Sequence, residues 1–520
     1  PERLASQFFR NVLQTLKISQ IIVDEAHCIS QWGYDFRPSY LAIAEVRKLK
    51  PDVAVLALTA TATPKVVDDI QERLNFRQKN VFRMSFERSN LAYIVRKTMA
   101  KHTELIHILN AVAGSAIVYV RSRKHASDIA SHISSANISA TFYHAGLEPA
   151  VKNQRQNSWQ QNEVRVMVAT NAFGMGIDKP DVRLVVHMDC PDSIEAYFQE
   201  AGRAGRDGKK AYAVLLWNNS DRRKLNKRVA ETFPEKEYIK EVYEDLAYYY
   251  QIGVASGAGY SFVFEIDKFC RTFKHFPVQT HSALQILERA GYIHYEMDPE
   301  ARARVMFKLG RNDLYRLDEG SAFEEAVITA LLRNYGGLFS NYVYIDESLL
   351  AQEAELTTHQ VYVILKNLAQ RNIINFIPQR KTPFITYLRD RVDGERVVLS
   401  KEIYEERKAQ YVARINAMQA YATNGDICRS RQLLIYFGEE RHKDCQQCDV
   451  CLEHASPEPS NEQTTTARNA ILNLLKDGER HHITELHKLN LPQKSLDVAL
   501  EYLIHEEEVG LDGSFLYVIA

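Results

Sequence analysis

The sequence predicts an α/β protein whose first part is built from parallel sheets covered by helices. Between Ser19 and about Trp217, short runs rich in valine, isoleucine and tyrosine alternate with helical patterns, which is typical of parallel strands joined by helical crossovers. Beyond Trp217 the pattern changes to helices that end in short strand-like segments. The length of 520 residues suggests three or more domains.

Six apolar runs are predicted to form the strands of the first part. They are 21–23, 53–58, 116–120, 165–169, 183–187 and 211–217. The segment 88–101 lacks a strong strand signal, so we predict that it links two sheet units, the first of them incomplete.

The second part repeats one pattern, L-x2-L-x5-[IV], which predicts a helix end followed by a turn into a strand. It occurs at Leu284, Leu287 and Ile293, at Leu365, Leu368 and Ile374, and at Leu500, Leu503 and Val509. The recurrence favours three winged-helix-like modules near 251–310, 320–400 and 465–520, although such spacings also occur in unrelated helical cores. A polar, proline-bearing linker at 457–461 precedes the last module.

The amino-acid composition excludes few classes of function. The formal net charge is -1, so nucleic-acid affinity would have to come from local basic and aromatic surfaces. No apolar run approaches the roughly 18 residues that span a bilayer, and no charged-then-apolar leader opens the chain. We therefore expect a soluble, intracellular protein without a membrane partner.

Two adjacent carboxylates follow the first predicted strand. The run 21–23 leads directly into Asp24 and Glu25, at the strand end where open parallel sheets place their chemistry. One carboxylate can hold the water shell of a magnesium ion while the other orients or deprotonates an attacking water. Alone, Asp-Glu-Ala-His is more typical of a solvated acidic strand end.

The loop 28–40 after these carboxylates contains four aromatic residues, an arginine, a glycine and a proline. Aromatic residues in a loop usually belong to a local core. So close to a catalytic strand, however, Trp32, Phe36 and Arg37 are also suited to stacking on nucleic-acid bases.

Threonine hydroxyls follow the second predicted strand. Thr59 and Thr61 can hydrogen-bond between the carboxylate site and a nucleic-acid path. The same threonine-rich stretch also suits the N-terminus of a helix that starts near Pro64, and the two interpretations are compatible.

Two later stretches supply glycines and guanidinium groups. In 169–180, glycines including Gly176 permit a close backbone approach, and Asp178 lies beside them. In 199–208, Arg203 and Arg206 are predicted to lie on neighbouring faces of a helix and to reach a terminal phosphate.

Together these stretches resemble the motifs of RecQ-family DNA helicases of the bacterial type. Residues 24–40 are similar to motif II and the aromatic-rich loop of that family, 169–180 to motif V and 199–208 to motif VI. The resemblance spans 1–217 almost without gaps. It implies two RecA-like lobes, an incomplete one at 1–97 and a second at 98–217.

The resemblance also implies roles for the matching residues. Asp24 would bind magnesium, Glu25 would act as general base, and Arg206, with Arg203 beside it, would contact the terminal phosphate of ATP. The other expected site residues are His27 and Gln199 between the lobes, Gly176 and Asp178 near the nucleotide, and Trp32, Phe36, Arg37, Thr59 and Thr61 on the nucleic-acid path.

A motor of this class also needs the phosphate-binding string Gly-x-x-x-x-Gly-Lys-[Ser/Thr]. It does not occur in residues 1–520, where Gly208-Lys209 is followed by Lys210. We therefore expect the phosphate-binding loop upstream of Pro1. Residues 1–520 alone should neither bind ATP tightly nor unwind DNA.

Four of the seven cysteines form the spacing C-x16-C-x2-C-x2-C. Cys428, Cys445, Cys448 and Cys451 can supply four thiolates to one tetrahedral zinc ion, and such a closed site is structural. Unrelated buried thiols are the alternative. Residues 428–439 also look like the RecQ zinc module.

One departure from the family pattern lies between the second lobe and this zinc module. The segment 218–400 intervenes and holds the first two winged-helix-like modules. We therefore predict an inserted helical region at 218–400, a helical zinc module at 401–455 and a winged-helix domain at 465–520.

The sequence thus predicts a RecQ-type ATP-dependent DNA helicase with ATP, Mg²⁺ and structural Zn²⁺ as cofactors. Movement 3′ to 5′ on single-stranded DNA, engagement of forked DNA and a role in recombination and repair are implied by the resemblance. The alternatives are a non-catalytic DNA-binding remnant of a helicase and an RNA helicase with the same two lobes, which the Trp32 loop and the four cysteines disfavour. We expect a cytoplasmic protein, nucleoid-associated if bacterial; protein partners are not predicted.

Overall fold

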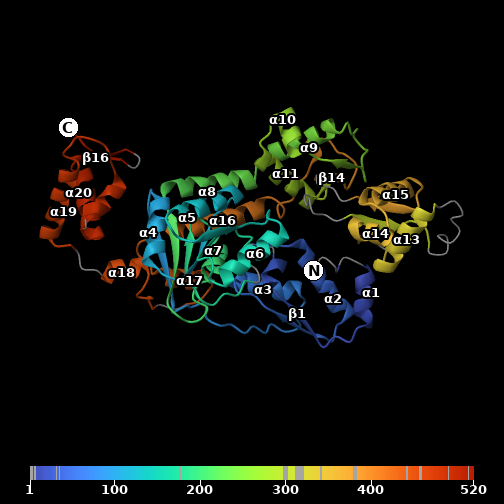
Figure 1. Cartoon of the computed structure of the whole chain (residues 1–520), viewed down its shortest axis with the longest axis horizontal. Coiled ribbons are helices and arrows are strands. Elements are labelled where there is room, and N and C mark those ends of the chain that lie inside the picture. Colours follow the sequence, from blue (N-terminus) through green and yellow to red (C-terminus); the bar gives the residue numbers. More distant parts are fainter. Residues whose placement is uncertain are drawn as a thin grey trace. The chain divides into compact units, whose positions relative to one another are not determined.

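The fold comes from a computed structural model of the chain (Figure 1). It describes residues 4, 7–30, 32–33, 35–174, 177–296, 303–310, 321–339, 342–378, 383–440, 443–455, 459–489, 491–512 and 515–519. Two compact units are present, one formed by 1–81 and 226–413 and the other by 82–225 and 414–520.

The first unit begins with two parallel strands and the helices around them. The elements are α1 (Gln7–Thr15), β1 (Gln20–Val23), η2 (Ala26–Ile29), η3 (Pro38–Ala42), α2 (Ile43–Leu49), β2 (Ala54–Ala57) and α3 (Pro64–Arg73). β1 and β2 pair in parallel, with Val23 opposite Ala57, so the residues that follow both strands lie at the same edge. This pairing brings Asp24 and Glu25 near the threonines after β2.

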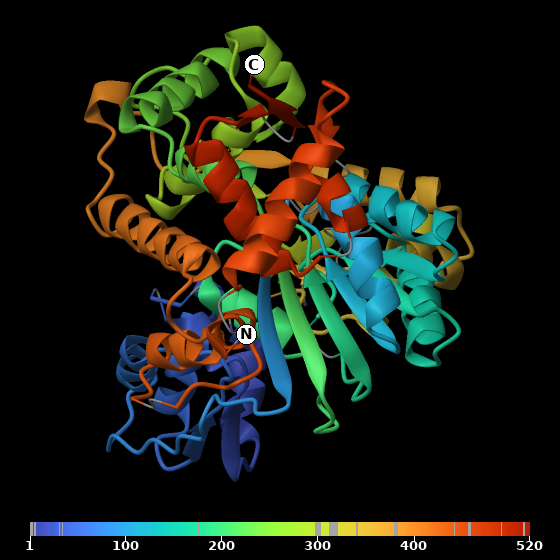
Figure 2. The same cartoon turned by 90° about the vertical axis from the view of Figure 1, so that its left-hand side faces the viewer.

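The second unit contains a six-stranded parallel sheet in the order β3-β8-β7-β4-β6-β5 (Figure 2). Its strands are β3 (Leu91–Lys97), β4 (Ser115–Tyr119), β5 (Ala140–Tyr143), β6 (Val166–Ala169), β7 (Val182–His187) and β8 (Ala211–Trp217). The predicted strands in this sheet are confirmed. The prediction of a link at 88–101 is wrong for Leu91–Lys97, which forms the edge strand β3.

Helices cover both faces of this sheet, and its central strands are therefore buried on both sides. Leu105 and Leu109 of α4 and Ile129 of α5 pack with Val118 and Val186 on one face. On the other face, Tyr197 of α7 lies 6.2 Å, centroid to centroid, from Tyr93 of β3. The crossover helices are α4 (Lys101–Ala111), α5 (Arg123–Ser135), α6 (Pro149–Gln160) and α7 (Ile194–Ala201).

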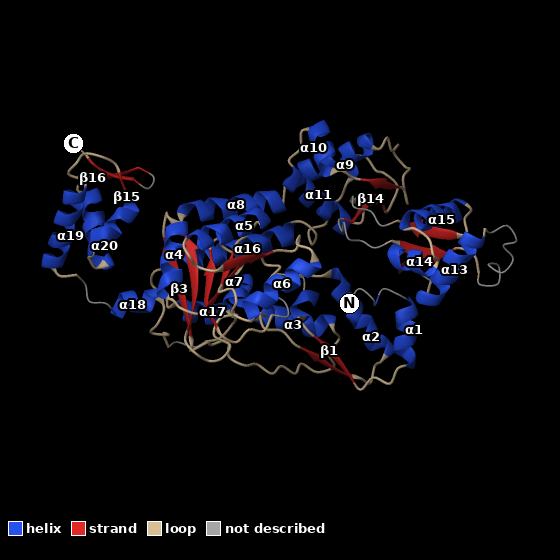
Figure 3. Cartoon of the chain, viewed as in Figure 1, coloured by secondary structure: helices blue, strands red, loops and turns tan. Residues whose placement is uncertain are grey.

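Each of the three repeated sequence patterns forms the predicted helix, turn and strand. The pairs are α11 (Pro277–Arg289) with β10 (Ile293–Glu296), α15 (Thr358–Gln370) with β13 (Ile374–Ile377), and α20 (Gln493–His505) with β16 (Val509–Asp512). Each pair belongs to a separate three-stranded sheet with its own apolar cluster. We call these the first, middle and terminal modules; Figure 3 shows their short strands and surrounding helices.

The first and terminal modules share one element order: helix, strand, two helices, two strands. The further elements of the first are α9 (Lys236–Tyr249), β9 (Ser261–Val263), α10 (Ile266–Phe273) and β14 (Phe384–Tyr387). Those of the terminal module are α19 (Asn461–Leu474), β15 (His481–His482), η5 (Ile483–Leu489) and β17 (Phe515–Val518). In both sheets the last strand lies in the centre, as in a winged helix.

The middle module is a circular permutation of this order. Its further elements are β11 (Arg304–Phe307), α13 (Ala322–Asn334), β12 (Val343–Tyr344) and α14 (Glu347–Glu353). The sheet order β12-β11-β13 places its central strand first in the sequence. In the sequence, the whole module is inserted between β10 and β14 of the first module (Figure 1). These two strands pair with each other, with Glu296 opposite Phe384.

The predicted boundary between these modules, at 310–320, is therefore wrong. It assigned β11 to the first module and β14 to the second, whereas pairing exchanges the two strands. The remaining elements are the helices α8 (Asn219–Thr232), α16 (Glu405–Thr423), α17 (Arg429–Tyr436) and α18 (Asp449–Ala455) and the turn η4 (Gly394–Arg396).

Candidate nucleotide site and metal centre

The two carboxylates lie directly after β1, as predicted. Glu25 has a left-handed backbone, with φ 49° and ψ 44°, and precedes the short helix η2. Few residues other than glycine adopt this conformation, and such strain concentrates at functional sites. The Glu25 amide donates to Oδ1 of Asp24 at 2.9 Å. The turn thus holds the Asp24 carboxylate against the backbone of Glu25.

His27 connects this turn to the threonines after β2. Its Nδ1 lies 3.1 Å from Oγ1 of Thr59 and 3.3 Å from Oε2 of Glu25. The ring is 1% exposed, and burial lowers the pKa of His27, so it is neutral at physiological pH. Thr61 is also buried, and its hydroxyl has no hydrogen-bond partner among the described residues. Four predicted residues, Glu25, His27, Thr59 and Thr61, therefore gather here.

The aromatic loop contacts its own unit. Trp32 packs on the apolar cluster around β1, and Nζ of Lys65 lies 2.9 Å from its ring centroid. Lys65 was not among the residues predicted for this site. The guanidinium of Arg407 lies 5.0 Å from the ring centroid of Phe36.

Arg37 forms an ion pair with Asp35 at 2.7 Å, and this hydrogen bond raises the pKa of Arg37. For Trp32, the structure therefore agrees with the local-core alternative as well. Core packing and base stacking can coexist on the two faces of an indole ring.

The two arginines after α7 have different surroundings in the second unit. Arg203 is 8% exposed and donates from Nη1 to the carbonyl of Gly174 at 2.6 Å. Arg206 is more exposed and donates to the carbonyl of Ile177 at 2.8 Å and to Oδ1 of Asp178 at 3.1 Å. Both hold the motif V loop. Gly176 of that loop lies outside the described residues.

The prediction that both arginines lie on a helix is wrong. α7 ends at Ala201, and both residues follow in consecutive turns, while Gln199 lies on the helix. Gly205 lies between the two arginines with φ +65°, and a Cβ there would lie 2.6 Å from Nδ2 of Asn90. Only glycine fits this close approach.

The four cysteines predicted to bind metal do converge. Their Sγ atoms all lie within 4.8 Å of one another, and the Cys428–Cys448 and Cys445–Cys451 pairs are each 4.0 Å apart. Tetrahedral zinc with Zn–S bonds of about 2.3 Å needs sulfurs about 3.8 Å apart. The geometry therefore fits one Zn²⁺ with four protein ligands and no open position.

Backbone amides and thiol chemistry support the same assignment. The amide of Cys445 donates to Sγ of Cys428 at 3.2 Å, and the amides of Arg429 and Cys451 donate to Sγ of Cys448 at 3.4 Å. Hydrogen bonds from Cys445 and Cys448 lower the pKa of Cys428, whereas burial raises the pKa of Cys451 to about 12. All four can ionise together only with a bound cation.

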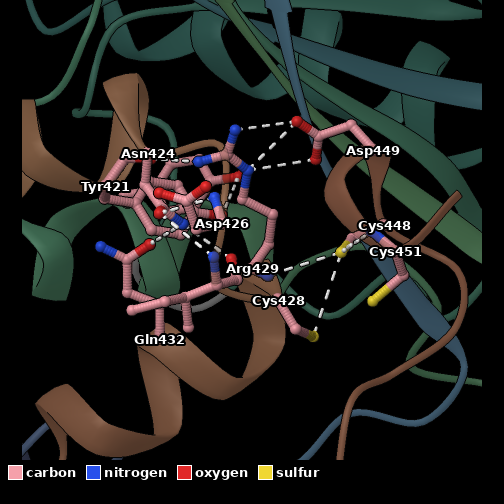
Figure 4. Close-up of polar contacts among 11 residues, drawn as sticks. Tyr421, Asn424, Asp426, Cys428, Arg429, Gln432, Cys448, Asp449 and Cys451 are labelled. Atoms are coloured by element: carbon pink, nitrogen blue, oxygen red, sulfur yellow. Dashed lines mark hydrogen bonds and ion pairs between the residues drawn. The ribbon is translucent and has the colours of Figure 1, made fainter. Parts of the chain in front are cut away.

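A buried arginine anchors the cysteines to the helices around them (Figure 4). The Arg429 side chain is 2% exposed, pairs with Asp449 at 2.8 Å and donates to the carbonyl of Tyr421. Sequence analysis missed this pair. Its signal was available, because each residue is the direct neighbour of a cysteine ligand, Cys428 or Cys448.

The zinc module also packs on the helix that carries Gln199. The hydroxyl of Tyr436 donates to Oε1 of Glu195 at 2.8 Å, and the Tyr421 hydroxyl lies 3.4 Å from that of Tyr197. Phe437 stacks on Phe86 with centroids 4.6 Å apart. Metal module and second lobe therefore share a partly polar, buried contact within one unit.

Family models cover four stretches of the chain. Residues 1–70 match a DEAD/DEAH box helicase model and 100–208 the helicase conserved C-terminal domain. These matches, with the parallel sheet and the acidic strand end, define the class of two-lobed helicase-type motors. Residues 388–452 match the RecQ zinc-binding model, and 305–378 match the RecQ helicase winged-helix domain of Bacteroidota. Over these stretches the chain is similar to RecQ-family helicases, because two of the four matched models are specific to RecQ proteins.

Named relatives agree with this assignment. The Bacillus subtilis ATP-dependent DNA helicase RecQ is 44% identical over 223 residues, covering 42% of this chain and 38% of that protein. The Caenorhabditis elegans RecQ-like DNA helicase blm-1 is 42% identical over 236 residues, covering 44% and 24%. The chain thus spans less than half the length of these curated relatives.

Among solved structures, the chain resembles Saccharomyces cerevisiae Dbp5 bound to RNA and ADP BeF3. The identity is 21%, the covered shares are 43% of this chain and 59% of that chain, and the TM-score is 0.35. Within the described part of the chain, none of the helices has the length and apolar character to cross a bilayer.

Proposed function

We propose that the chain is the motor and accessory part of an ATP-dependent DNA helicase that moves 3′ to 5′ on single-stranded DNA. The observation that carries the proposal is the strained turn after β1, where Asp24, Glu25 and the neutral His27 meet Thr59. Helicase motors place their magnesium site and general base at such a turn. RecQ relatives named as DNA helicases support DNA as the substrate.

In this proposal each side chain has one task. Asp24 would hold a magnesium ion, which would offset phosphate charge when bound, and Glu25 would orient and deprotonate the attacking water. His27 couples the position of Glu25 to that of Thr59 through its contacts with both side chains. Arg206 stabilises the charge on the transferred phosphoryl group, and Arg203 fixes the backbone beside it.

We assign the nucleic-acid path to the aromatic loop and to the threonines after β2. Trp32 and Phe36 stack on bases, while Arg37, Thr59 and Thr61 contact the strand beside them. The four cysteines hold one zinc ion that gives the module its shape. Forked DNA is the proposed substrate, and recombination and repair are the proposed processes.

The test uses the chain joined to a phosphate-binding loop, with Glu25→Gln and the control Glu72→Gln, whose side chain is exposed. General base removal should lower DNA-stimulated kcat by about 10²–10⁴-fold without weakening DNA binding. The control should retain wild-type hydrolysis. Steady-state ATPase rates and DNA affinities measured on both variants test whether Glu25 is the general base.

Two results would contradict the proposal. Stimulation by RNA but not by DNA would identify an RNA helicase. Hydrolysis that is absent in the wild type, with DNA binding intact, would identify a non-catalytic remnant.

A further inference from the structure

The three winged-helix-like modules differ in the charge of their helix-turn-helix segments. On α20 of the terminal module, Asp497 and Glu501 are both exposed and lie one turn apart. Residues 459–519 contain ten carboxylates against five lysines and arginines. Such a surface repels DNA phosphates rather than attracting them.

The corresponding segment of the middle module is also acidic. Its α14 starts with Glu347 and ends with Glu353, and Glu355 follows in the turn before α15. On the exposed side of α15, Lys366 is the cation. In the described residues of α14, α15 and the turn between them, carboxylates therefore outnumber lysines and arginines.

The first module differs from both. Lys268 and Arg271 are three residues apart on α10, so they are neighbours on the helix surface, and Lys274 follows at the C-cap of the same helix. All three are exposed, and none has a carboxylate partner among the described residues; Asp267 and Glu265 are the nearest acids in sequence.

Exposed apolar side chains continue this row of cations onto α11. Phe276 is 71% exposed and Val278 56%. The first turn of α11 contains no carboxylate, so the positive end of its helix dipole is not neutralised there. Together the five residues form what we call the basic strip.

The buried side of this segment holds the strip in place. Phe269 and Cys270 are buried beneath α10, and Sγ of Cys270 lies 3.4 Å from Oγ1 of Thr280 on α11. Lys274 has a left-handed backbone with φ 61°, which makes the turn sharp. His275, directly after it, is buried and bonds to Asp245 at 2.8 Å. The strip therefore lies on the helix-turn-helix segment formed by α10 and α11, which are labelled in Figure 1.

The hairpin of the first module is interrupted by the middle module. In a winged helix, a hairpin of the last two strands can add a second contact with nucleic acid. Here those strands are β10 and β14, and the middle module occupies the position of the hairpin loop. Among the described residues of the module, we therefore take the basic strip as the candidate surface for a polyanion.

We propose that duplex DNA binds the first module through the basic strip, and not through the middle or terminal module. In helix-turn-helix docking, the first helix crosses the phosphate backbone and the second directs its N-terminus into the major groove. Lys268, Arg271 and Lys274 would contact phosphates, and Phe276 and Val278 would contact the groove. This inference rests on the proposed DNA substrate.

The test measures binding of a fluorescent blunt duplex and of a single strand by anisotropy over a range of salt. Lys268→Gln, Arg271→Gln and Lys274→Gln are combined in one variant of the chain. The control combines Lys366→Gln and Lys494→Gln, one exposed or partly exposed cation on the second helix of the helix-turn-helix segment of each other module. All these side chains lie at the surface, and circular dichroism confirms that both variants fold.

We expect the triple variant to bind duplex at least about tenfold more weakly, with the salt slope reduced by about one for each cation removed. Affinity for the single strand should be kept, as should all binding by the control. The inference is overturned if the control loses duplex binding, if single-strand affinity falls in parallel, or if wild type binds only single strands. Wild type that binds neither DNA would instead refute the proposed function.

Discussion

At the level of residues, Arg203 and Arg206 lie three positions apart and have different surroundings. Their types and spacing indicated a phosphate-facing pair. The structure distinguishes them, because Arg203 is buried against Gly174 while Arg206 remains accessible beside Asp178. That difference depends on how the turn after α7 folds back at Gly205, and no local pattern encodes it. The motif therefore identified the two arginines as candidate site residues, whereas tertiary packing determines how buried each of them is.

A buried carboxylate in the second unit allows a test of the contact between α7 and α17. Glu195 is 4% exposed, its Oε1 accepts from Tyr436, and its Oε2 has no partner among the described residues. Tyr436→Phe should lower the free energy of unfolding by about 1–3 kcal/mol, because a buried acceptor loses its donor. Chemical denaturation of the two proteins measures this.

The control is a double-mutant cycle. In a Glu195→Leu background the same Tyr436→Phe change should cost little, since no acceptor remains to be satisfied. Equal losses in both backgrounds would show that the tyrosine acts only through packing.

At the level of elements, the sequence predicted the interior of the six-stranded sheet but neither edge. Interior strands such as β6 and β8 are buried on both sides and read as continuous apolar runs. The edge strands are β3, which ends in exposed charged residues, and β5, which is only half-buried throughout. An edge strand has a weaker apolar pattern, so composition cannot separate it from a loop.

The zinc module gives a second prediction, at the scale of an element. Cys448→Ser should remove zinc from the chain and unfold the segment around α17 and α18, because a four-thiolate site contributes folding free energy. Metal analysis of freshly purified protein should find about one zinc per wild-type chain and little in the variant. Cys190→Ser, a buried cysteine outside the cluster, should keep its zinc. Wild-type protein without zinc would refute the site.

At the level of the whole molecule, the repeated pattern predicted three modules but not their nesting. Each L-x2-L-x5-[IV] match describes a helix and one strand, and it carries no information about which distant strand pairs with them. β14 lies far along the chain from β10, yet the two are paired. Strand pairing of this kind is a non-local property, which local periodicity cannot show.

The nesting predicts that the middle module can be removed. Because Glu296 and Phe384 are paired, an Asn-Gly turn can replace 297–383 and close a normal two-residue hairpin. The first module should keep its fold, and amides of β9, β10 and β14 should keep their protection against hydrogen exchange. Loss of protection in these strands would mean that the middle module supports the first.

The same nesting constrains the order of folding. To form their pairing directly, β10 and β14 must close a loop of about 90 residues, and loop-closure entropy rises with the logarithm of that length. Once the middle module has folded, its paired ends at Arg304 and Ile377 shorten the effective loop to the two connecting segments, which lowers the closure cost by about 2 kcal/mol. The middle module should therefore fold first. A destabilising change in the core of the middle module should then slow formation of the sheet of β9, β10 and β14, although the middle module contributes no strand to that sheet.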